Sequence, residues 1–266
     1  DDDLSRGLGD VYKRQVNAIN AEGSDPSMIV NTSNETVINS GTLSGNVILG
    51  AGTDSISNSG TINGDVDLGD GDDSFEYVAG STSAAVDGGD GTDTVFFTVT
   101  SGDAATTVNG SDFSAIETAD HSAGGDLTLA FTSDVSFNNV IVGTDSILRL
   151  QNANAANVTT TLDAGSGLSV DSSSSLSNTA DNGIVVQAIG DGVTIDNQGS
   201  IAATGANGAA IAFTGGTNTL INSGSLSATG SSITGGTGSD IIDNSGTITG
   251  DAQLGAGDDQ VTLTAS

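Results

Sequence analysis

The sequence predicts an all-β protein folded as a single-stranded parallel β-helix, a solenoid whose coils are about 19–25 residues long. Three observations lead to this prediction. One motif recurs at a nearly fixed step, apolar and polar residues alternate within each copy as they do in strands, and glycine-rich corners separate these short strands. Coils of this kind bury their apolar face only against their neighbours, so their backbone hydrogen bonds run from each coil to the next.

The clearest repeat is the segment 38–75, in which the motif occurs twice in succession. Asn39 and Asn58 hold the same place in the two copies and are 19 residues apart. In the second copy, Val66 and Leu68 alternate with aspartates, which is typical of a strand with one buried and one solvated face. The glycines and asparagines between the strands tolerate a positive φ and therefore favour corners.

The composition fits a thin core and excludes several classes of partner. The 266 residues include 39 glycines, no cysteine, 4 basic and 34 acidic residues, and 35% are hydrophobic. A net charge of −30 would repel nucleic acid and anionic membranes, so we expect neither as a partner and no membrane insertion of this segment. Acidic, glycine-rich chains are often disordered, but the regular apolar alternation argues against disorder here.

Along the chain, residues 1–15 do not share the repeat. They contain three of the four basic residues and resemble translated adapter sequence, so we expect a non-native tail. Residues 16–266 are predicted to form one continuous β-helix, a fragment truncated at both ends. The motif blurs over 101–178, which we interpret as degenerate coils; an inserted globular domain is the alternative, but helical periodicity and capping signals are missing.

The corners offer the strongest candidate site. A Gly-x-Gly-x-Asp pattern recurs, and segments 88–96 and 235–243 match the nine-residue Gly-Gly-x-Gly-x-Asp-x-apolar-x pattern of calcium-binding RTX repeats. Glycines let carbonyl groups turn toward one point, and aspartates add the oxygen ligands that calcium prefers. The alternative is that these residues only satisfy turn amides. The candidate calcium ligands are Asp54, Asp73, Asp93, Asp240 and Asp259; the first three are expected to stack in a column.

Other polar residues favour structural roles. Five asparagines recur at one corner and are predicted to form a ladder of side-chain amides: Asn39, Asn58, Asn197, Asn222 and Asn244. The single histidine, His121, lies in a glycine-rich stretch that does not single it out for a catalytic triad. Arg149 is the one basic residue outside the tail, and the Asp72-Asp73 and Asp258-Asp259 pairs belong to corners. We therefore predict no catalytic residues.

The repeat contains the motif Asn-Ser-Gly-Thr-Ile-x-Gly-Asp-Val-x-Leu-Gly-x-Gly-x-Asp. This motif resembles the passenger regions of Gram-negative autotransporters, and so does the looser segment 113–150. The resemblance covers about 38–261. It implies a right-handed β-helix, exported through its own membrane barrel and displayed at the cell surface or released outside the cell. The implied function is structural and adhesive, with host or neighbouring cells, matrix or glycans as partners. The alternatives are an RTX-like calcium-binding secreted protein and a β-helical carbohydrate-active enzyme.

Overall fold

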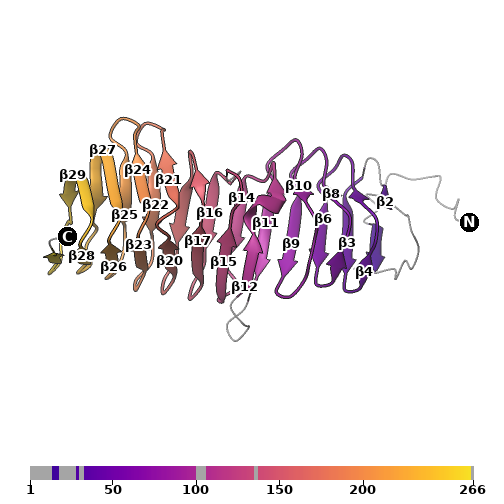
Figure 1. Ribbon diagram of the computed structural model, residues 1–266, viewed down its shortest axis with the longest axis horizontal. Helices are drawn as coiled ribbons and strands as arrows, with labels where there is room; N and C mark the ends of the chain where they lie inside the picture. The colour runs from indigo at the N-terminus through magenta and orange to yellow at the C-terminus, as the bar shows by residue number, and fades with distance from the viewer. Residues whose placement is uncertain (1–13, 18–27, 30–32, 100–105, 135–136, 265–266) are drawn as a thin grey trace, which may run out of the picture.

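The computed structural model describes residues 14–17, 28–29, 33–99, 106–134 and 137–264. These residues form a parallel β-solenoid of about 10 turns, which confirms the predicted fold class. Figure 1 shows an elongated stack whose coils follow one another in chain order from the N-terminal to the C-terminal end. The described residues contain no α-helix, and so no helix that could cross a membrane, and one short 3-10 helix, η1 (Gly110–Asp112).

Each coil passes through three strand positions, which we call faces 1, 2 and 3 in chain order. Face 1 contains β1 (Arg14–Asn17), β3 (Glu35–Asn39), β6 (Ser55–Asn58), β9 (Ser74–Val78), β11 (Thr94–Thr98), β14 (Thr118–His121), β16 (Asn139–Val142), β19 (Thr159–Leu162), β22 (Ile184–Ala188) and β25 (Ala209–Phe213).

Face 2 follows face 1 in chain order. It contains β4 (Thr42–Leu43), β7 (Thr61–Ile62), β12 (Thr106–Asn109), β15 (Asp126–Ala130), β17 (Ile147–Gln151), β20 (Gly167–Val170), β23 (Thr194–Asn197), β26 (Thr219–Asn222), β28 (Ile241–Asn244) and β30 (Gln260–Leu263).

Face 3 comes last in chain order. It contains β2 (Met28–Ile29), β5 (Val47–Ile48), β8 (Val66–Asp67), β10 (Val86–Asp87), β13 (Phe113–Ser114), β18 (Asn154–Ala155), β21 (Ser175–Asn178) and β24 (Ser200–Ala203). Near the C-terminal end, β27 (Ser225–Thr234) and β29 (Thr247–Gln253) run across the corner and join faces 3 and 1.

Residues with equal places in the motif meet on neighbouring coils. Asn39 pairs with Asn58, and Ile56 pairs with Phe75, in parallel register. Alternate residues of β6 are buried, so Ile56 points inward while its neighbours point outward. A slip by one residue would turn the apolar set toward solvent, and this is why the alternation fixes the register.

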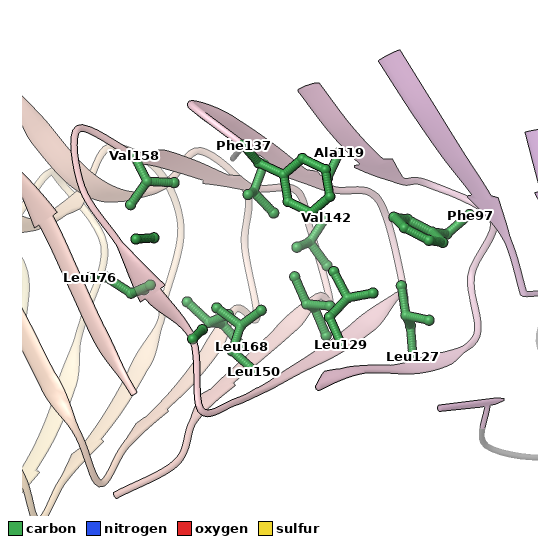
Figure 2. Close-up of a cluster of buried hydrophobic side chains, with 14 of the residues drawn as sticks. Phe97, Ala119, Leu127, Leu129, Phe137, Val142, Leu150, Val158, Leu168 and Leu176 are labelled. Atoms are coloured by element: carbon green, nitrogen blue, oxygen red, sulfur yellow. The ribbon is translucent and has the colours of Figure 1, made fainter. Parts of the chain in front are cut away.

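The inward side chains form one continuous apolar core along the axis. Figure 2 shows part of it, in which Phe97, Leu129 and Phe137 lie among leucines and valines of successive coils. The rings of Phe97 and Phe113 meet edge to face with centroids 5.4 Å apart. Six of the seven phenylalanines are buried, and the chain has no tryptophan; this is enough because a solenoid needs only a narrow filling between its faces.

The stack continues through the segment with the blurred motif. Thr118 pairs with Asn139, which pairs with Thr159, so the coil remains about 20 residues long although the corner sequence is lost. At the N-terminal end, β1 includes the last two residues of the segment 1–15: Arg14 pairs with Glu35. The rest of that segment lies outside the described residues.

Candidate functional site

Three of the predicted site residues, Asp54, Asp73 and Asp93, stack in one column as the repeat predicts. Each stands just before a face 1 strand. The N–H of Asp54 donates to Oδ1 of Asp73 (2.6 Å), and the N–H of Asp73 donates to Oδ1 of Asp93 (2.8 Å). Glu117 continues the series, because its Oε2 accepts from the N–H of Asp93 (2.8 Å). We call these four carboxylates the acidic column.

The three aspartates of the column are buried, and one carboxylate oxygen of each has no donor. The side chains of Asp54, Asp73 and Asp93 are 1%, 3% and 0% exposed. In each, Oδ2 is buried without a hydrogen-bond partner. A charged oxygen in this position loses its hydration and gains little in return, so the ionised form is disfavoured.

The pKa values follow from this burial. Burial raises the pKa of Asp73 to about 6; the hydrogen bond from Asp54 N–H opposes this rise, and the charges of Asp54 and Asp93 add to it. Burial likewise raises the pKa of Asp93, opposed by the bond from Asp73 N–H and reinforced by Glu117. The backbone donors keep the carboxylates in place, while their mutual repulsion and burial favour uptake of a proton.

The other two predicted residues lie in a separate column. Oδ1 of Asp259 accepts from Asp240 N–H (2.9 Å), Oδ1 of Asp240 accepts from Asn218 N–H (3.0 Å), and Oδ1 of Asn218 accepts from Val193 N–H (3.1 Å). Here the column precedes the face 2 strands β28 and β30. The same motif therefore lies on face 1 in the N-terminal half and on face 2 in the C-terminal half, so the five aspartates do not form one site.

The geometry can be compared with the two hypotheses for the corners. One oxygen of every predicted aspartate accepts a backbone N–H from the neighbouring coil, which is the arrangement that the turn hypothesis describes. Within the described residues, no group of three or more His, Cys, Asp or Glu side chains is placed to hold a metal ion. Calcium binding stays a prediction, which is tested below.

The corner glycines allow the coils to stack this closely. Gly69 has a φ of +104°, and a Cβ added there would lie 1.7 Å from the carbonyl oxygen of Gly50 on the preceding coil. Neither the φ nor the space admits an L side chain. Glycine is therefore required at this corner by backbone packing, with or without a ligand.

The predicted asparagine ladder is present as two separate runs. Asn39 donates from Nδ2 to Oδ1 of Asn58 (2.8 Å) on face 1. On face 2, Asn197 donates to Asn222 (2.8 Å) and Asn222 to Asn244 (2.6 Å). Asn58, Asn222 and Asn244 each accept from the asparagine on the preceding coil, so the ladder satisfies their amide oxygens inside the stack. Oδ1 of Asn197, at the start of its run, is buried without a partner.

Sequence reasoning placed the aspartates beside Val66 and Leu68 on the solvated face, but it overlooked that the outward carboxylates of neighbouring coils stack on one another. Asp67 pairs with Asp87 on face 3, and Asp70 pairs with Asp90 at the following corner. These four side chains, with Gly50, Gly69 and Gly89, line a shallow hollow in the surface. The alternation that places Val66 and Leu68 inside directs the intervening Asp67 outward, so the signal was present in the sequence.

The candidate catalytic groups are occupied by structural contacts. Both ring nitrogens of His121 face backbone carbonyl oxygens. Asp72 accepts from Thr92 N–H, beside the column that holds Asp73. Arg149 pairs with Asp126 at 3.2 Å on the surface, with both side chains 40% exposed. Such an exposed pair contributes about 0–1 kcal/mol.

Comparisons with protein-family models, curated proteins and solved structures find no match for this chain.

Proposed function

We propose that this chain is an extracellular, non-enzymatic structural and adhesive solenoid of the kind found in Gram-negative autotransporter passengers. It presents its faces to host or neighbouring cells, to matrix or to glycans. The observation that carries the proposal is that the inward and the outward side chains of the solenoid have different roles. The interior is bound along the axis by strand pairing, acidic columns and asparagine ladders, and the outward side chains take no part in these bonds.

A rod built in this way suits display at a distance from a membrane. The coils are held by hydrogen bonds that run parallel to the axis, so each coil supports its neighbours over the whole length. The outward rows consist mainly of short polar and acidic side chains, such as Ser57, Thr128 and Asp196. These side chains can bond to polar partners such as glycans without exposing a large apolar patch.

Adhesion is tested with the full 266-residue chain coupled to fluorescent beads. We expect the beads to bind at least one of three surfaces: epithelial cells, a panel of matrix proteins, or a glycan array. The control is a globular protein of similar size and net charge, which measures attraction through cations alone. Binding no greater than the control on all three surfaces would contradict the adhesive role.

Display is tested separately in cells that express the gene encoding this chain. Protease added to intact cells should remove the solenoid from the surface, or the solenoid should be found in the medium, while a cytoplasmic marker stays intact. A solenoid that is degraded only after lysis would refute surface display.

A further inference from the structure

His121 is the only histidine of the protein and is the last residue of β14. Its side chain is 1% exposed. It pairs with Val142 on the next coil and follows Ala119 along the inward row of its own strand. The proposed adhesive function assigns nothing to this buried ring.

Both ring nitrogens face oxygens that can only accept hydrogen bonds. Nδ1 lies 3.2 Å from the carbonyl oxygen of Phe97, on the preceding coil, and Nε2 lies 2.8 Å from the carbonyl oxygen of Gly125 in the turn that follows β14. The Gly125 oxygen also accepts from Ile147 N–H (2.9 Å), so both of its lone pairs are used.

The ring lies where backbone pairing between two coils stops. Regular pairing of β11 with β14 ends at Phe96 and Asp120. At the next residue, Nδ1 of the His121 side chain faces the Phe97 carbonyl oxygen. The other side of the ring reaches Gly125 across the turn 122–125, where the chain changes from face 1 to face 2.

A neutral imidazole has one N–H, so in either tautomer one ring nitrogen would direct a lone pair at a carbonyl oxygen. Both contacts are hydrogen bonds only when both nitrogens carry hydrogen. We propose that His121 is a buried imidazolium that locks the corner between β14 and β15, and that losing one of its two N–H protons releases one side of this lock as the pH rises.

Two carboxylates close to His121 along the chain, Asp120 and Asp126, are engaged with other side chains. Asp120 on β14 accepts from the Ser122 hydroxyl, and Asp126 on β15 pairs with Arg149. Strands β11 and β16 carry no charged residue, and Asp145 stands in the turn before β17. Among the described residues, no carboxylate is hydrogen-bonded to the ring, so its charge is balanced by two carbonyl dipoles and by the field of a chain of net charge −30.

The sign of the pH effect follows from the two bonds. The folded protein uses the second proton, whereas the unfolded chain leaves it to water. The stabilisation by His121 is therefore present while both ring nitrogens carry hydrogen and is reduced when one of the two N–H protons is lost.

The protonation state can be measured directly, because one histidine gives one unambiguous set of ring signals. In the ¹⁵N-labelled full chain, long-range ¹H–¹⁵N correlation at pH 7 should show hydrogen on both ring nitrogens. A single unprotonated nitrogen in the folded protein at this pH would overturn the proposal. This measurement needs no variant and is independent of any adhesion assay.

The lock is tested with His121→Gln, whose amide can reach only one of the two carbonyl groups, and with the surface variant Asp120→Asn as control. We expect the difference in melting temperature between wild type and His121→Gln to be several degrees at pH 5 and to shrink toward pH 8, while Asp120→Asn stays close to wild type. A difference that is constant over this range would overturn the lock. If His121→Gln does not fold, faster amide exchange at 124–125 than in the neighbouring strands of the wild type with rising pH is the expected result, and unchanged relative exchange refutes it.

Discussion

The backbone N–H of Asp54 donates to the side-chain oxygen of Asp73 one coil further along the chain, over 2.6 Å. This bond turns a corner residue into a link between coils, because the acceptor on each coil belongs to a residue whose own N–H is held by the next. The link has a cost, since Oδ2 of Asp73 is buried without a donor. Stability and pH response at these corners therefore depend on the same side chain.

Two substitutions of Asp73 distinguish the effect of its hydrogen-bond acceptor from the effect of its buried charge. Asp73→Ala leaves Asp54 N–H buried without a partner, so the free energy of unfolding should fall by about 1–3 kcal/mol. Asp73→Asn keeps an acceptor oxygen and removes the buried charge, so it should cost less than Asp73→Ala. The second column contains this solution already, because Asn218 accepts from Val193 and donates to Gly215. Urea unfolding at pH 7 measures the stability of both variants. Equal losses of unfolding free energy would contradict the role of Asp73 as the acceptor that links the two coils.

The raised pKa of Asp73 makes the solenoid more stable in mild acid. With an unfolded value near 3.8 and a folded value of about 6, the folded protein binds the extra proton between about pH 4 and about pH 6. Stability should therefore fall as the pH rises through this window. Thermal unfolding at half-unit pH steps checks the slope, with Asp73→Asn as the matched variant. The same slope in both proteins would remove Asp73 as its source.

Calcium distinguishes the two interpretations of the corners. If the aspartates serve the turns, addition of calcium to about 5 mM should leave the melting temperature within a degree of the value in chelator, because Oδ1 is occupied and Oδ2 is buried. Magnesium at the same concentration controls for screening of the net charge. A rise of several degrees with calcium alone, lost in Asp73→Asn, would establish the calcium hypothesis.

Two glycines with positive φ provide a test of the close stacking. Gly69→Ala meets both an unfavourable φ and a carbonyl oxygen at 1.7 Å, so we expect a loss above about 3 kcal/mol or failure to fold. Gly80 has a φ of +84° but nothing within 4 Å of an added Cβ, so Gly80→Ala should cost only about 1 kcal/mol. The difference between the variants isolates the contact with Gly50. Similar losses of stability in the two variants would show that the positive φ alone, and not the contact with Gly50, determines the cost of adding a Cβ.

Much of the architecture could be predicted from local pattern. The step from Asn39 to Asn58 and the alternation around Val66 were enough to predict parallel coils, because strand periodicity decides which residues are inside and a constant step decides which residues meet. The column of Asp54, Asp73 and Asp93 followed from the same argument. The stacking of the outward Asp67 on Asp87 could have been predicted in the same way.

The sequence by itself determined the coil, its buried positions and the stacking of equal residues on adjacent coils, since these depend on spacing within about twenty residues. Only the tertiary structure decided that the motif ending in Asp73 lies on face 1 while the one ending in Asp259 lies on face 2, and that His121 meets the carbonyl groups of Phe97 and Gly125. The physical reason is that differences in coil length add up along the chain. The coils between the two halves differ in length, since Thr94 pairs with Thr118 and Thr160 with Val186, and the sum of these differences is fixed by packing across the core, which no local pattern records.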